Sequence, residues 1–91
     1  MPEITRIYDI INEKGMHARA AAKFVEIVEN HAAEAEVFKD GVSAAGDSIM
    51  GLLMLTASKG TSIEVRFAGD DAEKLADALG ELIGQRFHER F

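Results

Sequence analysis

The chain has 91 residues, of which 47% are hydrophobic and 29% are charged, and its formal net charge is −6. This length and balance predict one small globular domain rather than a disordered segment. The absence of cysteine excludes disulfides and thiolate metal sites, and the excess of acidic residues disfavours nucleic-acid binding. No secretory signal pattern opens the chain, and no apolar stretch reaches the roughly 20 residues that cross a bilayer. We therefore expect a cytoplasmic protein with no membrane insertion.

The first half of the chain predicts a strand, a helix and a hairpin. Apolar residues alternate in part over residues 3–11, which is typical of a strand. Residues 18–30 carry apolar side chains at positions i, i+3, i+4 and i+7, which predicts an amphipathic helix. The dipeptide Asp40-Gly41 suits a tight turn with positive φ, so residues 35–44 are expected to form a hairpin.

The second half begins with a short helix and a strand. Residues 46–55 predict a short apolar helix, with Asp47 or Ser48 as its N-cap. Residues 61–69 alternate apolar and charged side chains, which predicts a strand with one buried face.

The final segment, residues 70–87, has apolar residues at helical spacing, and Asp70 is expected to be its N-cap. The predicted element order is therefore β-α-β-β-α-β-α. This order favours an α+β open-faced sandwich, in which a four-stranded antiparallel sheet carries three helices on one face.

The segment KGMHARAAAKF, residues 14–24, places His17 directly before a predicted helix. The amides of Ala18, Arg19 and Ala20 then have no acceptor within the helix, and the helix dipole favours an anion beside them. The dipole disfavours a positive imidazole, so a neutral, nucleophilic His17 is expected. Arg19 can neutralise phosphoryl oxygens with its planar fork of donors. These residues predict a phosphoryl-accepting site, and no second catalytic group is apparent in the segment.

Two motifs carry a resemblance to a known family. GMHARAAAKF closely resembles the active-site motif of the histidine-containing phosphocarrier protein HPr of the bacterial phosphotransferase system, and DSIMGLLML is similar to its regulatory serine and second helix. The resemblance implies a single HPr-like phosphocarrier domain over residues 1–91. It also implies that Enzyme I phosphorylates His17 on Nδ1, with phosphoenolpyruvate as the ultimate donor, and that Arg19 assists the transfer.

The second motif implies a modification site and an interface. Ser48 matches the serine that an HPr kinase/phosphorylase modifies in some bacteria. The resemblance also implies an apolar surface that docks Enzyme I and the IIA-type proteins of a sugar or nitrogen-related branch, formed here by Ile49, Met50, Leu53 and Met54. Leu52 and Leu55 are available for burial, which allows the methionines to remain exposed as an adaptable contact patch.

One residue departs from the family pattern. The family usually has proline directly after the arginine, and this chain has Ala20 there. Proline is tolerated in a first helical turn, whereas alanine restores an amide donor and has the best helix propensity. We therefore expect no loss of function. No cofactor or metal is expected, because neither His31 nor His88 has metal-ligand spacing.

Other functions remain open from the residues alone. The chain is expected to be a phosphoryl relay rather than an enzyme that turns over independently. It could instead be a regulatory interaction protein whose histidine or serine phosphorylation is read by partners, or a small-molecule-binding domain in which His17 lines the ligand site. Without the resemblance, Arg19 would be a solvated side chain and Ser48 only a helix cap.

Overall fold

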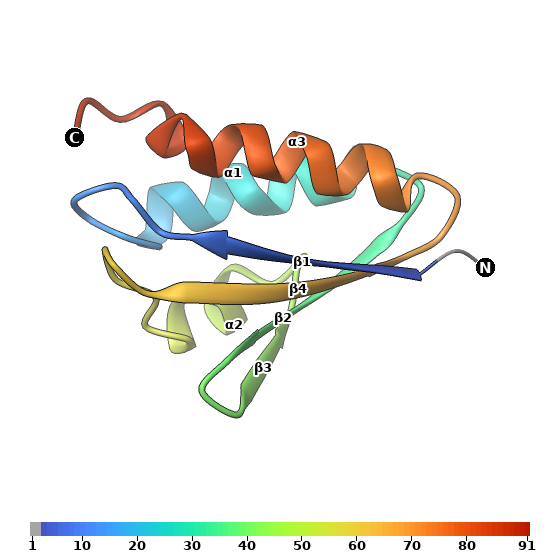
Figure 1. Cartoon of the computed structure of the whole chain (residues 1–91), viewed down its shortest axis with the longest axis horizontal. Helices are drawn as coiled ribbons and strands as arrows, with labels where there is room; N and C mark the ends of the chain where they lie inside the picture. The colour runs from blue at the N-terminus through green and yellow to red at the C-terminus, as the bar shows by residue number, and fades with distance from the viewer. Residues whose placement is uncertain (1–2) are drawn as a thin grey trace.

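The computed structural model describes residues 3–91, which form a four-stranded sheet with three helices on one face (Figure 1). The strands pair antiparallel in the order β1-β4-β2-β3. This arrangement confirms the predicted α+β open-faced sandwich and its element order. The elements in chain order are β1 (Glu3–Asp9), α1 (Ala18–Glu29), β2 (Glu34–Lys39), β3 (Val42–Ala45), α2 (Ile49–Met54), β4 (Ser62–Ala68) and α3 (Ala72–Gly84).

The sheet buries the face that its alternating sequence predicts. Strand β4 lies between β1 and β2, and its inward residues Ile63, Val65 and Phe67 are at most 1% exposed. The hairpin between β2 and β3 turns at Asp40 and Gly41, whose φ values of 50° and 81° confirm the predicted turn. The other face of the sheet is uncovered, as the alternation of charged residues in these strands indicates.

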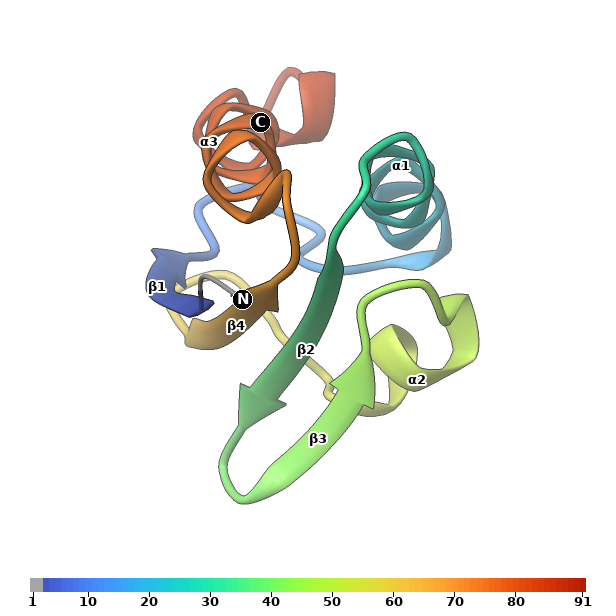
Figure 2. The same ribbon diagram turned by 90° about the vertical axis from the view of Figure 1, so that its right-hand side faces the viewer.

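Helices α1 and α3 lie side by side across the sheet, and α2 packs beside β3 and α1 (Figure 2). Their apolar stripes close the core over the sheet, and Phe24 of α1 and Leu75 and Leu79 of α3 are fully buried. No helix within residues 3–91 is long and apolar enough to cross a bilayer.

The start of α3 corrects one prediction. The N-cap of α3 is Asp71, so the assignment of Asp70 as the cap was wrong. The side chain of Asp71 makes no capping bond to its own helix, and its carboxylate instead accepts a hydrogen bond of 2.8 Å from the amide of Ala32. The aspartate therefore ties the beginning of α3 to the segment that follows α1.

The end of α3 corrects a second prediction. The helix ends at Gly84, and the expected continuation to Phe87 is replaced by a short turn, η1 (Arg86–His88). The three residues of this turn have φ values of 56°, 55° and 63°, which is the left-handed region. The turn places the Phe87 ring in the core at 0% exposure, so burial of this ring opposes the local backbone strain.

Candidate functional site

His17 is the N-cap of α1. Its backbone is extended, its carbonyl accepts the first intrahelical bond from the amide of Ala21 at 2.8 Å, and its Nδ1 atom accepts from the amide of Arg19 at 3.3 Å. This confirms that the helix begins directly after His17. Nδ1 therefore lies at the end of the helix where unpaired amides favour an anion.

The loop before His17 is held by the backbone of the segment after α2. The amide of Met16 donates to the carbonyl of Ala57 at 2.8 Å, and Met16 itself is buried. Gly15 has a φ of +64°, and a Cβ atom there would lie 2.5 Å from the same carbonyl oxygen. Only glycine allows the backbone at position 15 to approach the Ala57 carbonyl this closely, and this contact fixes the chain just before α1.

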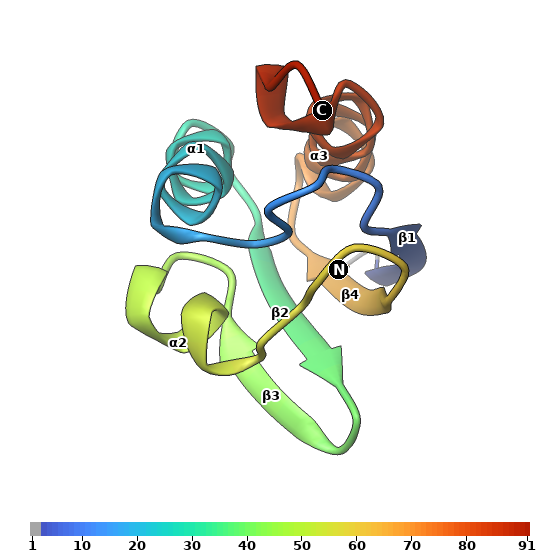
Figure 3. The ribbon, with the colours of Figure 1, turned by 90° about the vertical axis from the view of Figure 1, so that its left-hand side faces the viewer.

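The other ring nitrogen of His17 meets a residue that sequence reasoning missed. Nε2 contacts the Oε2 atom of Glu89, which is 72 residues away in the chain. The other oxygen of Glu89 accepts from Nδ2 of Asn12 at 3.0 Å. Asn12 is fully buried, and its Nδ2 also donates to the carbonyl of Gly15 at 2.9 Å. The C-terminal segment and the loop after β1 therefore meet at the histidine, at one end of the molecule (Figure 3).

These contacts assign the tautomer of His17. The amide of Arg19 can only donate, so Nδ1 presents a lone pair, and an ionised Glu89 can only accept, so Nε2 carries the proton. Burial raises the pKa of Glu89, but hydrogen bonds from His17 and Asn12 and the charges of His17 and Lys14 outweigh it and lower that pKa below its ordinary value of 4.5. Glu89 is thus an anion at neutral pH, and its carboxylate accepts the hydrogen bond from Nε2 of His17.

A basic hollow of about 740 Å³ adjoins the histidine. Arg19 is exposed, and within residues 3–91 its guanidinium makes no ion pair. Lys23 is partly buried and donates to the carbonyl of Phe87 at 2.6 Å. The guanidinium of Arg19 is therefore available to an anion in the hollow that adjoins His17. The residues that line the hollow are Glu13, Lys14, Arg19, Lys23, His88, Glu89, Arg90 and Phe91.

Helix α2 carries the second predicted site. Ser48 is its N-cap, and its Oγ accepts from the amide of Gly51 at 3.0 Å, so the alternative cap Asp47 is excluded. Met50 and Met54 are each 70% exposed and Ile49 is also exposed, whereas Leu53 is partly buried against the core. The side chains that are buried here are Leu52 of α2 and Leu55, which directly follows the helix. The exposed residues form an apolar patch next to α1, against which α2 packs.

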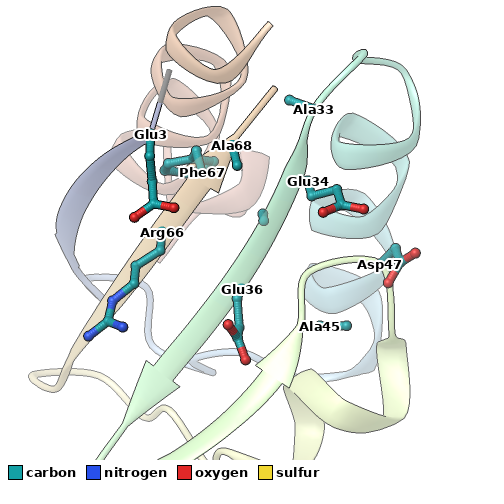
Figure 4. Close-up of a pocket in the computed structure, with 10 residues that line it drawn as sticks. Glu3, Ala33, Glu34, Glu36, Ala45, Asp47, Arg66, Phe67 and Ala68 are labelled. Carbon is teal, nitrogen blue, oxygen red and sulfur yellow. The ribbon is translucent and has the colours of Figure 1, made fainter. Parts of the chain in front are cut away.

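A separate hollow of about 550 Å³ lies on the sheet, where residues of all four strands line it (Figure 4). Its lining includes four acidic side chains and one arginine, and none of the residues that contact His17 lines it. Within residues 3–91, no group of three or more histidine, cysteine, aspartate or glutamate residues is arranged to hold a metal ion. The charged residues that line this hollow are Glu3, Glu34, Glu36, Asp47 and Arg66.

Comparison with known proteins agrees with this geometry. The family model described as "PTS HPr component phosphorylation site" matches residues 4–85. The chain is 42% identical to the phosphocarrier protein HPr of Pseudomonas aeruginosa over 88% of this chain and 90% of the relative. It is 34% identical to the phosphocarrier protein NPr of Shewanella violacea over 98% of both chains. The crystal structure of HPr-C-His from Thermoanaerobacter tengcongensis has a TM-score of 0.88 and 36% identity, with full coverage of both chains. The chain therefore belongs to the HPr family of phosphocarrier proteins of the bacterial phosphotransferase system.

Proposed function

We propose that this chain accepts a phosphoryl group on Nδ1 of His17 from Enzyme I and passes it to a IIA-type protein. The observation that carries the proposal is the placement of Nδ1 at the N-terminal end of α1, where it presents a lone pair beside the first-turn amides. Ala18, Arg19 and Ala20 provide these amides, which suit phosphoryl oxygens. Transfer between such proteins takes place in the cytoplasm.

The chemistry is a displacement at phosphorus. The lone pair of Nδ1 forms the new nitrogen–phosphorus bond, the bond from phosphorus to the donor atom breaks, and the donor keeps that electron pair. The phosphoryl oxygens then accept from the amides at the start of α1, and Arg19 supplies a bidentate donor pair. Onward transfer reverses these steps with a new nucleophile, so His17 is restored and the chain is a relay rather than an enzyme.

The patch on α2 is proposed as the docking surface for both partners. Ile49, Met50, Leu53 and Met54 offer flexible apolar side chains that can adapt to more than one protein surface. Ser48 lies at the edge of this patch, and we propose it as the site that an HPr kinase/phosphorylase modifies. A phosphate there would introduce about −1.5 to −2 charge units next to an apolar interface.

The test uses Enzyme I of a related phosphotransferase system with labelled phosphoenolpyruvate. We expect acid-labile label on the wild-type chain, none on His17→Ala, and full label on the matched control His31→Ala, whose ring contacts the carbonyl of Ile27 away from the site. Equal labelling of the wild type and His17→Ala would refute the proposal. If the labelled chain passed no phosphoryl group to any IIA-type protein, the regulatory function would be favoured instead.

A further inference from the structure

We propose that Glu89 is a positioning residue for His17, which holds the imidazole in the tautomer and orientation that direct the Nδ1 lone pair to the start of α1. The contact of its carboxylate with Nε2 is the starting observation. This inference rests on the phosphocarrier function proposed above and adds a residue from the C-terminal segment to its site. Glu89 lies beyond residues 4–85, which the family model matches, so the match assigns it no role.

The carboxylate is held in place by the loop that carries the histidine. One oxygen contacts His17 and the other accepts from Asn12, whose side chain is 0% exposed and also donates to the carbonyl of Gly15. Both oxygens of Glu89 therefore have a partner, and the carboxylate cannot rotate without losing one of them. A fixed acceptor on Nε2 requires the proton on that atom and leaves Nδ1 as the nucleophile.

The backbone on both sides of Glu89 is anchored. Before it, the Phe87 ring is fully buried and the Phe87 carbonyl accepts from Lys23 at 2.6 Å. After it, the carbonyl of Phe91 accepts from the amide of Glu13 at 2.8 Å. These contacts hold the backbone of the segment beside the histidine, although the side chains of His88 and Phe91 remain exposed.

The conformation of η1 supports the same role. Three successive residues other than glycine, Arg86, Phe87 and His88, have positive φ, although a regular helix would be locally more favourable. Such strain persists where surrounding contacts stabilise it, and it is frequent at functional sites. Continuation of α3 in its right-handed course would carry the chain away from this path, so the left-handed turn is what brings Glu89 to His17.

Both stages of the transfer are compatible with the contact. When Nδ1 forms its bond to phosphorus, the ring becomes a cation that still carries the proton on Nε2, and the carboxylate of Glu89 stabilises that charge. When the phosphoryl group leaves, the electron pair returns to Nδ1 and Nε2 remains protonated. No proton has to leave the pair in either direction, so Glu89 orients and stabilises the ring without taking part in bond formation.

The test compares Glu89→Ala with Glu13→Gln, a control that removes the same charge from the same hollow but from a side chain paired with Lys59 at 3.1 Å. Long-range proton–nitrogen NMR correlation spectra report the tautomer of His17 in the unphosphorylated chain, and the signals are assigned by their loss in His17→Ala. We expect one tautomer, with the proton on Nε2, in the wild type and Glu13→Gln, and a mixture in Glu89→Ala. We also expect the maximal rate of phosphoryl acceptance from Enzyme I to fall about tenfold in Glu89→Ala, at an unchanged half-saturating concentration.

A second variant separates the effect of the shape of the Glu89 side chain from the effect of its two acceptor oxygens. In Glu89→Gln the amide group must face a donor, either His17 or Asn12, so we expect a rate between those of Glu89→Ala and the wild type. An unchanged tautomer or an unchanged maximal rate in Glu89→Ala would overturn the proposal, and so would an equal loss of rate in Glu13→Gln. A wild-type chain that takes no phosphoryl group from Enzyme I but shows the expected tautomers would refute the phosphocarrier function and leave the contact of Glu89 established.

Discussion

Replacement of Ser48 separates its role as a helix cap from its proposed role as a modification site. Ser48→Ala removes the hydrogen bond that the amide of Gly51 donates to Oγ, and such a loss destabilises a protein by about 1 kcal/mol. For a domain of this size, that change lowers the melting temperature by about 4–8 °C. Ser48→Asp keeps an acceptor of similar capping strength, so its melting temperature is expected to remain near that of the wild type.

Binding to Enzyme I should depend on the charge at position 48 and not on the strength of the helix cap. Ser48→Ala adds no charge beside the apolar patch of Ile49, Met50, Leu53 and Met54, so it should accept the phosphoryl group at the wild-type rate. Phosphoserine at position 48 places a double charge at the edge of that patch, and desolvation of this charge weakens association. A loss of only about 1.4 kcal/mol reduces binding tenfold, so we expect acceptance at limiting concentration to be at least about tenfold slower.

The assay measures thermal unfolding by circular dichroism and the initial rate of His17 labelling by Enzyme I for four forms of the chain. These are the unmodified protein, Ser48→Ala, Ser48→Asp and the authentic phosphoserine form. If the phosphoserine form accepts as fast as the unmodified chain, the patch beside Ser48 is not the Enzyme I surface. If Ser48→Ala is slowed as much as the phosphoserine form, the effect comes from the lost cap and not from the charge.

Three further changes test the site and its support. Arg19→Lys should slow phosphoryl acceptance without a change in stability, because an ammonium group cannot form the bidentate pair; unchanged rates would make Arg19 a solvated charge. Gly15→Ala should lower the free energy of unfolding by about 2–5 kcal/mol, because it combines a left-handed backbone with a clash against the Ala57 carbonyl. Chemical denaturation measures this change, and a value below about 0.5 kcal/mol would show that the loop can move. Burial raises the pKa of Tyr8 from 10.0 to about 12, and its hydroxyl donates to the carbonyl of Ala76. Because the folded-state pKa of Tyr8 is the higher one, its contribution to stability is complete below the ordinary pKa and is lost as pH rises toward the folded value. Tyr8→Phe should therefore show a smaller decline in unfolding free energy between about pH 10 and about pH 12, and an identical decline would contradict the assignment.

Local signals in the chain are enough to predict most of the fold. The alternation in residues 61–69 and the helical spacing in residues 18–30 appear in the structure as β4 and α1. The position of His17 before a run of helix formers predicts its place as N-cap, and Ser48 follows the same rule. These features depend on neighbours within a few residues, so the sequence pattern records them directly.

Contacts between segments that are distant in the chain leave no comparable pattern in the sequence. Glu89 is one acidic residue in a charged tail, and nothing in its neighbourhood indicates that it meets His17, 72 positions earlier. Asn12 reads as an ordinary loop residue, and only its burial between the loop and the tail makes it a partner of Glu89. Asp71 and not Asp70 occupies the N-cap position of α3, and its carboxylate accepts from the amide of Ala32, which only the folded chain brings within reach.

The end of α3 shows the physical reason. Helical spacing continues to Phe87, so local preference favours a longer helix, but burial of that ring in the core outweighs the strain of a left-handed turn. The segment beyond the turn is thereby directed to His17, where it meets the ring nitrogen opposite the one at the start of α1. The position of His17 at the start of α1 is thus a local property of the chain. The carboxylate of Glu89 lies on the other side of the ring only because distant apolar side chains, Phe87 among them, pack in one core.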